Sequence, residues 1–295
     1  MRALVATSRT RHRRALHTAH ILGQVFTYVV LLAGGVVSIF PYYWMVSSSF
    51  KENWEIIRYP PTFFPQSVTL EHYIVILNTT GLVRGFLNSV IVTSSRVVLV
   101  VIISTMVGYA LAKLRFPGRD ALFLFSLAIM MVPFQLFLIP LFLLMDKYNL
   151  IDTYTALIIP GAVNSFSLFL MRQAFLTMPD DYIDAALIDG AGHFRILFRI
   201  GVPMVTPMLL TVALVNAFWS WNEFLWPYLV ILHDYMATLP VALARYSRMV
   251  VGAGQTIRWG DVMAGTTIAG APMIFIFLIL QRRFVEALTM TGLKG

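Results

Sequence analysis

Long apolar stretches alternate with short polar segments along this chain of 295 residues. Five stretches contain no Lys, Arg, Asp or Glu, and a sixth is interrupted only by Arg96. The charge-free stretches are 15–50, 121–145, 153–171, 200–222 and 262–281, and the sixth is 85–112. A membrane-spanning helix needs about 20 largely apolar residues. The pattern predicts an all-α membrane protein with six spanning helices, near 21–46, 86–112, 121–145, 154–176, 203–225 and 263–283.

Five prolines lie within these predicted spans. Proline removes a backbone donor and clashes with the preceding turn, so each is expected to kink or interrupt its helix. Kinks let helices pivot, although proline is also common in membrane helices without a hinge role. The five are Pro133, Pro140, Pro160, Pro207 and Pro272.

Composition supports a membrane protein and excludes several other classes. The chain is 58% hydrophobic and 12% charged, whereas soluble domains are about 45–50% apolar and about 25% charged. The outer loops, about 47–85 and 226–262, are too short for independent domains of ordinary size. Cysteine is absent, which excludes disulfides and thiol nucleophiles. The sequence contains no GxxxxGK[ST] phosphate loop and no HExxH metal pair, so an enzyme has almost no support.

The net charge of +8 suggests either nucleic acid binding or a topology signal, and in a membrane protein the second explanation is favoured. If the N-terminus lies inside, fourteen basic residues fall on the inner side and seven on the outer side. This bias predicts that both termini are cytoplasmic. We expect a basic leader over 1–20, a transmembrane domain over 21–284 and a tail over 285–295. The apolar run after the leader is too long for a signal peptide, and no A-x-A site follows it.

The loop 177–202, between the fourth and fifth predicted spans, is far longer than a tight turn requires. Pro179 suits the first turn of a short helix, and the two aspartates that follow suit its positive end. Gly190 supplies a left-handed C-terminal stop. We therefore expect a short helix that ends just before Gly190.

This short helix carries one apolar face, formed by Ile183, Ala186 and Leu187 at i, i+3 and i+4 spacing. Ala185 and Ala186 have little bulk, so the backbone of another protein can approach closely. The alternative is an amphipathic helix lying on the membrane surface. Its apolar face is too short and its start too acidic for that role, which favours protein docking.

The same loop resembles a known family. Its spacing is similar to the E-A-A-x3-G-x9-I-x-L-P signature of permease subunits of binding-protein-dependent ABC importers, although Asp184 replaces Glu and Val202 replaces Leu. The matched positions are Asp184, Ala185, Ala186, Gly190, Ile200 and Pro203. Further segments resemble the carbohydrate-uptake branch, which includes the smaller maltose-permease subunit. They are 86–89, 108–110, 115–119, 259–261, 281–284 and 292–295.

The resemblance implies a six-helix permease in the bacterial inner membrane, without a cofactor of its own. Residues 180–194 would form a coupling helix that docks on an ATP-binding subunit, which holds ATP and Mg. The implied partners are a second homologous permease, two ATP-binding subunits, an extracytoplasmic solute-binding protein and the bilayer, with no nucleic acid. In this family the C-terminal tail can reach the ATPases; a frayed tail is the alternative. The tail positions concerned are Thr289, Gly292, Lys294 and Gly295.

Polar residues inside the predicted spans are candidates for the translocation pathway, because charges in a membrane usually face a cavity or a partner. Arg96 lies about ten residues into the second span, and Glu223 ends the fifth within an aromatic run. Aromatic rings beside amides and carboxylates suit sugar binding, whereas interhelical hydrogen bonding is the plainer role. The candidates are Arg96, Asn164, Trp221, Asn222 and Glu223, and Gln135, Ser165 and Ser167 carry the same ambiguity.

The last outer loop is basic and broken by glycines, with Arg245, Arg248 and Arg258. In the resembling family the corresponding loop touches the binding protein. A basic loop also suits a phosphorylated solute, and solvated surface charge is the third reading.

Together with the resemblance, these features predict a permease subunit that forms half of the translocation pathway of an ABC importer for a sugar or oligosaccharide. An ABC permease for glycerol phosphate, a polyol or another non-sugar solute is the alternative. An ion-driven secondary transporter is a more distant rival, since such folds are commonly built from internal repeats that this sequence does not display.

Overall fold

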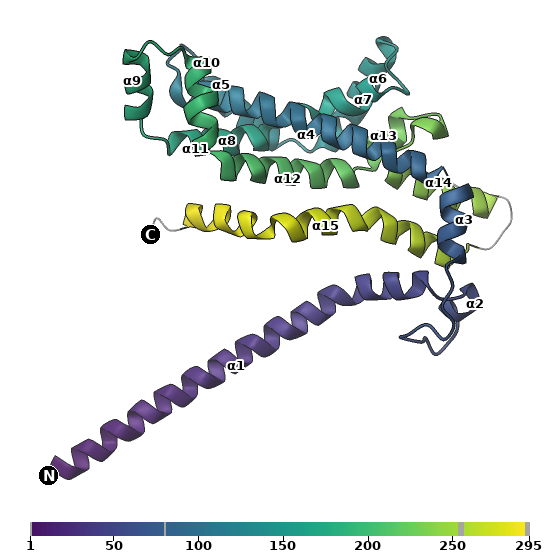
Figure 1. Ribbon diagram of the computed structural model, residues 1–295, viewed down its shortest axis with the longest axis horizontal. Helices are drawn as coiled ribbons and strands as arrows, with labels where there is room; N and C mark the ends of the chain where they lie inside the picture. The colour runs from purple at the N-terminus through teal and green to yellow at the C-terminus, as the bar shows by residue number, and fades with distance from the viewer. Residues whose placement is uncertain (1, 80, 253–256, 293–295) are drawn as a thin grey trace. The chain divides into compact units, whose positions relative to one another are not determined.

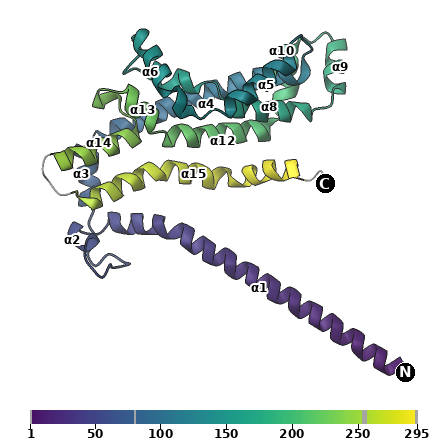
Figure 2. The same cartoon turned by 180° about the vertical axis from the view of Figure 1, so that it is seen from behind.

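The computed structural model describes the backbone of residues 2–79, 81–252 and 257–292, and the side chains of 23–78, 81–248, 257–279 and 281. Within these residues the chain is helical and contains no strand. It divides into two compact units. Figures 1 and 2 show the helices of the chain from opposite sides. Unit 1 comprises Met1–His72 and Arg258–Thr267, and unit 2 comprises Tyr73–Ile257 and Ile268–Gly295. Each unit is described separately.

Unit 1 is built around the long helix α1 (Arg2–Ser49). Its apolar part, Gly23–Ser49, is long enough to cross a membrane, but the helix itself starts well before the predicted position 21. The rest of unit 1 is α2 (Asn53–Ile56), the first residues of α3 (Glu71–Thr79) and the first turns of α15 (Trp259–Gly292).

A buried polar junction joins these pieces of unit 1. His72 donates from Nε2 to the carbonyl oxygen of Lys51 over 2.8 Å, and its Nδ1 lies 2.6 Å from Oδ1 of Asp261. A carbonyl oxygen can only accept and an ionised carboxylate can only accept, so both ring nitrogens carry protons and the ring is an imidazolium. The hydrogen bond to Asp261 raises the pKa of His72 above 6.5, although burial opposes the shift. Glu55, also buried, accepts from the Thr62 hydroxyl over 2.6 Å.

Unit 2 is built around the central helix α4 (Leu82–Lys113), which packs against α8, α12 and α14 (Figure 1). Its first half continues with α5 (Arg119–Met130), η1 (Phe134–Phe137), α6 (Leu138–Lys147), α7 (Tyr154–Ile158), η2 (Ile159–Gly161) and α8 (Ser165–Leu176). The second half holds α9 (Asp181–Ile188), α10 (His193–Ile196), the π-helical turn η3 (Leu197–Gly201), α11 (Val202–Met204), α12 (Thr206–Asn222), α13 (Leu225–Val230), η4 (Asp234–Met236) and α14 (Leu239–Gly252).

Three of the predicted spans are not continuous helices. In the described residues, Gly23–Ser49, Leu82–Lys113 and Trp259–Ile279 are long and apolar enough to cross a membrane without a break. The predicted helices 121–145 and 154–176 are instead pairs of helices, bent by 93° and 44°. The predicted helix 203–225 is mainly the second member of a third pair, His193–Met204 and Thr206–Asn222, which is bent by 81°. Counting each pair as one span gives up to six.

The breaks lie close to three of the predicted prolines. Pro133 precedes η1, Pro160 lies in η2, and Pro207 occupies the first turn of α12. Pro140 and Pro272, in contrast, lie inside α6 and α15, which the structure assigns as continuous helices. Three of the five prolines thus mark breaks as predicted, whereas Pro140 and Pro272 interrupt no helix.

Close packing of α4 on α8 depends on Gly108. A Cβ atom there would lie 2.8 Å from Cβ of Met171 and 3.0 Å from the backbone nitrogen of Arg172, so a side chain would push the two helices apart. Small residues allow such close contact between membrane helices. The adjoining core contains Tyr109, Phe175 and Ile196, all buried.

Candidate functional sites

The predicted loop 177–202 contains α9 and α10, and it folds as the sequence predicts at Gly190, between these two helices. Gly190 has φ +77°, in the left-handed region. Its N–H donates to the carbonyl of Leu187 over 3.0 Å, and the N–H of Ala191 donates to the carbonyl of Ala186 over 2.9 Å. These two bonds form a Schellman motif, which ends α9 and turns the chain toward α10.

The C-terminal end of α4 holds both ends of this loop. Lys113 donates from Nζ to the carbonyl of Met178 and to Oδ1 of Asp180, each over 2.6 Å. The hydrogen bond and the charge of Lys113 keep the pKa of Asp180 below its usual value. On the other side of α9, the hydroxyl of Tyr109 lies 3.2 Å from Nδ1 of His193. These contacts attach the loop to α4 on both sides of α9.

On α9, Ala186 lies on the buried face, whereas its sequence pattern predicted that it would be available to a partner. Ile183 and Ala186 are buried in the core of unit 2, whereas Leu187 is 42% exposed. Ala186 is thus part of the inner face and is not available for close approach of a partner. Ala185 and Asp184 are exposed, and Tyr182 and Ile188 flank them with 54% and 87% exposure. The outward face therefore has a small side chain at its centre and larger, mainly apolar side chains at its edges.

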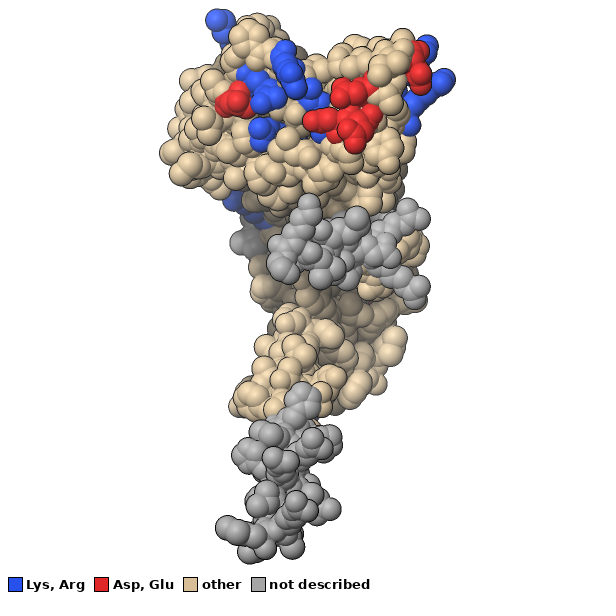
Figure 3. Space-filling view, turned by 90° about the vertical axis from the view of Figure 1, so that its left-hand side faces the viewer, with Lys and Arg blue, Asp and Glu red and all other residues tan. Residues whose placement is uncertain are grey.

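Charged side chains of both signs gather on the end of the molecule that carries α9 and α10 (Figure 3).

Two further positions of the loop signature lie beyond α9. Ile200, in η3, packs partly buried against the core, and Pro203, in α11, is exposed. These two positions shape the return of the chain toward α12.

A cavity of about 670 Å³ opens within unit 2 between α4, η1, the α7–α8 link and α12. It brings together four of the five candidate pathway residues, which lie far apart in the sequence: Arg96, Asn164, Asn222 and Glu223. Gln135 and Asn216 add amide groups. Aromatic walls are contributed by Phe134, Phe218, Trp219 and Trp226.

The two charged residues of the cavity form an ion pair. Nη1 of Arg96 contacts Oε2 of Glu223, and the side chains are 17% and 20% exposed. Gly161 makes room for the guanidinium, since a Cβ atom at this position would overlap it. The cavity lining therefore carries balanced charge, surrounded by amides and aromatic rings.

Other polar residues near the cavity have structural partners. Asn164 caps α8 by accepting from the N–H of Ser167 over 3.0 Å. Asn216 donates to the Ser167 hydroxyl over 2.7 Å and so links α12 to α8. The predicted pathway residue Trp221 does not line the cavity. It is buried, donates to the carbonyl of Ala269 over 2.9 Å and packs edge-on against Phe86.

Phe134 and Asn216 line the cavity but were not among the predicted site residues, whereas Trp226 ends the aromatic run 219–226 that was considered for sugar binding. Phe134 is an apolar residue in an apolar stretch, so nothing in the pattern separates it from the core. Asn216 was a polar residue within a predicted span, and that signal could have identified it.

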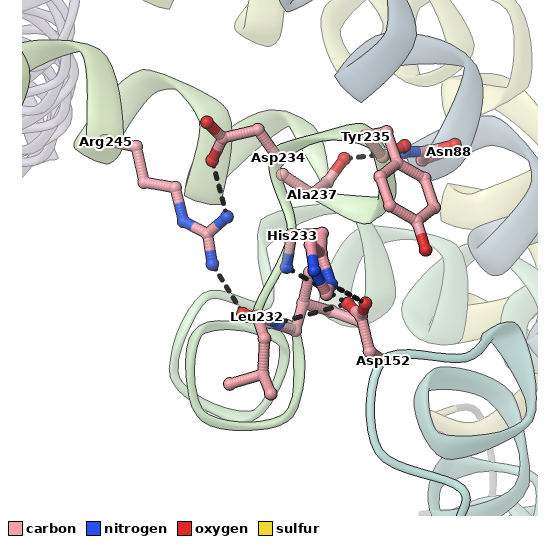
Figure 4. Close-up of polar contacts among 9 residues, drawn as sticks. Asn88, Asp152, Leu232, His233, Asp234, Tyr235, Ala237 and Arg245 are labelled. Atoms are coloured by element: carbon pink, nitrogen blue, oxygen red, sulfur yellow. Dashed lines mark hydrogen bonds and ion pairs between the residues drawn. The ribbon is translucent and has the colours of Figure 1, made fainter.

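At the other end of unit 2, Asp152 anchors the loop that follows α13 (Figure 4). Its carboxylate accepts from the backbone N–H groups of Leu232 and His233, over 3.1 and 3.2 Å, and contacts the His233 ring. Burial alone would raise the pKa of Asp152, but the hydrogen bonds from His233 and Leu232 outweigh burial and lower it.

The three arginines of the last outer loop are each engaged. Arg245 donates to Oδ1 of Asp234 over 2.7 Å and to the carbonyl of Ile231 over 2.5 Å (Figure 4). Arg248 contacts the hydroxyl of Tyr228. Arg258 belongs to unit 1, where it bonds to Glu71 and Asp261 over 2.7 and 3.2 Å.

The predicted tail contacts fall largely outside the described residues. Thr289 and Gly292 belong to the last turns of α15, but their exposure is outside the described part of the structure. Lys294 and Gly295 lie entirely outside it.

Comparison with known proteins places this architecture in a family. The profile described as "Binding-protein-dependent transport system inner membrane component" matches residues 101–290. The arabinooligosaccharides transport system permease protein AraQ of Halalkalibacterium halodurans is 38% identical over 262 residues, covering 88% of this chain and 92% of its own. The diacetylchitobiose uptake system permease protein NgcG of Streptomyces coelicolor is 31% identical, covering 89% and 86%.

A further relative has a different named substrate. The sn-glycerol-3-phosphate transport system permease protein UgpE of Yersinia pestis is 29% identical, covering 90% of this chain and 95% of its own. Among solved structures, a chain of a bacterial ABC transporter involved in the import of the acidic polysaccharide alginate has the same fold. Its TM-score is 0.79 at 23% identity, and the match covers 89% of this chain and 96% of that one. The chain therefore belongs to the inner-membrane components of binding-protein-dependent transport systems, and it is a non-enzymatic permease subunit of an ABC importer.

Proposed function

We propose that this chain forms one half of the translocation pathway for a neutral oligosaccharide. The observation that carries this proposal is the chemistry of the cavity. Aromatic rings stack against the CH faces of a sugar, and Gln135, Nδ2 of Asn164 and Oδ1 of Asn222 match its hydroxyl groups. The other amide atoms of the two asparagines are occupied, since Oδ1 of Asn164 caps α8 and Nδ2 of Asn222 donates to the carbonyl of Phe218 over 2.8 Å. Binding sites for small molecules commonly combine such apolar walls with a few placed polar groups. The relatives named for arabinooligosaccharides and diacetylchitobiose support the same class of solute.

The charge balance of the cavity argues against an anionic solute such as glycerol phosphate. Arg96 is the cation in the cavity lining, and Glu223 already neutralises it. A phosphate would have to displace this carboxylate or lie close to it, and carboxylate and phosphate repel each other. Arg245, on the outer loop, is likewise occupied by Asp234 and the carbonyl of Ile231.

The outward face of α9 is the proposed docking surface for an ATP-binding subunit. Its small centre, Ala185, lets a partner approach closely, and its exposed edges offer apolar contact. ATP and Mg belong to that partner. Closure of two ATP-binding subunits would move α9, and the contacts of Lys113 and Tyr109 would carry this motion into α4, which lines the cavity.

The proposed topology has six spans, counting each bent pair once, and both termini in the cytoplasm. The leader 1–20, the membrane domain 21–284 with its coupling loop 177–202, and the tail 285–295 follow from this assignment. The tail would reach the ATP-binding subunits. Arg245, Arg248 and Arg258 would face the binding protein on the outer side.

The test is transport by the importer purified with its partners from the native host. Its own binding protein delivers radiolabelled solute to reconstituted vesicles that contain ATP. Uptake of a neutral oligosaccharide that requires ATP, and that unlabelled glycerol phosphate does not compete, is expected. Competition by glycerol phosphate but not by oligosaccharides would contradict the substrate class. Uptake that continues without ATP would contradict the coupling role.

A further inference from the structure

An apolar groove lies between α4, α5 and α8, at the end of α4 that holds Lys113. It has a volume of about 390 Å³ and is lined by Met106, Val107, Ala110, Leu111, Phe116, Leu122, Ser126 and Leu168. Ala110 lines it with a small side chain that leaves space, while Phe116 and Leu122 are exposed beside it. Because α4 is long and apolar enough to cross a membrane, a groove along it would lie beside the hydrocarbon region of the bilayer, and the Lys113 end would lie near the surface.

A second cleft, also of about 390 Å³, continues from the first at Phe116, which lines both. Its other walls are Arg115, Gly118, Arg119, Asp120 and Ala121. The groove therefore changes from apolar to basic at the point where the span α4 ends and the first turn of α5 begins. The unpaired backbone N–H groups of that turn add partial positive charge.

The local charge at this basic end is positive. Asp120 is neutralised by Arg119, at 3.3 Å, and by Arg172, at 3.8 Å. Asp180 is neutralised by Lys113. Within the described residues Arg115 forms no ion pair, and it is exposed. Arg115 and Arg119 therefore line the cleft with a single carboxylate, Asp120, which leaves an excess of one positive charge there.

An apolar channel that runs along a membrane span and opens onto surplus arginines matches one ligand class. We propose that this groove binds one anionic phospholipid, with an acyl chain along α4 and α5 and its phosphate beside Arg115 and Arg119. A zwitterionic lipid would fill the apolar part equally well but would gain less from the arginines. Each Lys or Arg near a membrane surface contributes about 1 kcal/mol to binding of anionic lipid, which is about fivefold in affinity.

The groove also lies beside the loop that α4 anchors. Lys113, three residues before Phe116, bonds to Asp180 at the start of α9. A lipid phosphate at Arg115 would therefore sit next to the α4–α9 contact.

Lipid binding at this groove does not depend on which solute is transported. A negative result for the lipid therefore leaves the proposed function standing, and a negative result for the solute leaves the lipid site standing.

The test uses the assembled importer in nanodiscs of phosphatidylethanolamine and phosphatidylglycerol, with retained lipid identified by native mass spectrometry. We expect the wild type to retain phosphatidylglycerol in preference. Arg115→Gln with Arg119→Gln should lower this preference roughly 25-fold, whereas Lys substitutions at both positions should largely keep it. Ala110→Leu should fill the groove and lower retention of both lipids. Lys147→Gln, an exposed charge at the end of α6, is the matched control and should change nothing.

Two results would overturn the proposal. One is an unchanged lipid preference in the double glutamine variant. The other is a photo-crosslinker at Leu122 that captures the partner permease or another part of this chain in the bilayer instead of lipid. Capture of phosphatidylglycerol at Leu122, lost in Ala110→Leu, supports it. Assembly and ATP hydrolysis of each variant report whether it has folded.

Discussion

At the scale of single residues, the pairing of Arg96 with Glu223 explains why a membrane protein keeps two charges in its interior. The sequence identified both residues, because charges within apolar stretches are costly and seldom without a role. It could not identify their pairing, since 127 residues separate them. Trp221 was predicted as a pathway residue because it belongs to the same aromatic run as the cavity residues. In the structure α12 directs it toward α15 instead.

Replacing Glu223 by Gln should leave Arg96 without its counter-charge. Breaking a fully buried pair costs about 3–5 kcal/mol, and the partial exposure of this pair reduces that cost. We expect lower uptake of the neutral oligosaccharide and new inhibition by an acidic oligosaccharide of the same length, measured in reconstituted vesicles. The exchanged pair Arg96→Glu with Glu223→Arg should recover much of the uptake. Inhibition that is the same in wild type and Glu223→Gln would contradict the charge balance argument.

Replacing Gly161 by Ala should disturb the same pair without changing any charge, because the added Cβ overlaps the guanidinium of Arg96. The guanidinium ends a flexible side chain and can move aside, so we expect a cost at the low end of the about 1–3 kcal/mol typical of overpacking. We expect a lower thermal midpoint of the purified importer and reduced uptake. Gly270→Ala is the control, since a Cβ atom there meets nothing within 4 Å. Equal midpoints for the two variants would show that Gly161 does not serve the ion pair.

At the scale of secondary structure, hydropathy located the apolar segments but did not show where a helix breaks inside one. Apolar runs continue through the breaks near Pro133, Pro160 and Pro207, so the pattern predicted three single helices where the structure has pairs. The coupling loop was predicted more fully, because its signals are local. Gly190 fixes the end of α9 by its own backbone conformation, whereas the burial of Ala186 depends on core residues distant in sequence.

Replacing Gly190 by Val should distort the Schellman motif that ends α9. A non-glycine residue in the left-handed region costs about 1–2 kcal/mol, and the space around this Cβ is open, so the cost is backbone strain alone. We expect ATP hydrolysis by the assembled importer to continue while uptake falls. Gly192→Ala provides the control, because Gly192 has φ −76° and equally open surroundings. Equal uptake by both variants would contradict a role for the loop geometry in coupling.

At the scale of the whole molecule, the fold class, the number of apolar segments and the family could all be inferred from the sequence. These depend on long patterns and a loop signature, which need no tertiary contact. The polar junction of unit 1 was not predicted. In the sequence its members look like ordinary charged residues of loops and helix ends. Only the fold buries them together: Lys51, Glu55, His72 and Asp261.

The His72 imidazolium should make unit 1 sensitive to pH. Because its folded pKa is raised, its contribution to stability is complete below 6.5 and is lost as the pH rises through the raised value. We expect the thermal midpoint of the importer to exceed that of His72→Gln at mildly acidic pH, with the difference shrinking at alkaline pH. A difference that stays constant across this range would show that His72 is not charged in the folded protein.

The central claim is that the outward face of α9 is where an ATP-binding subunit acts on this chain. The protein has no cysteine, so a single cysteine can be placed on α9 without background. Ala185→Cys lies on the exposed face, and Ala186→Cys, its neighbour, lies on the buried one. The measurement is thiol-specific crosslinking in membranes that contain the complete importer. We expect Ala185→Cys to form a covalent product with the ATP-binding subunit and Ala186→Cys to form little. A transporting importer in which Ala185→Cys yields no such product would contradict the account.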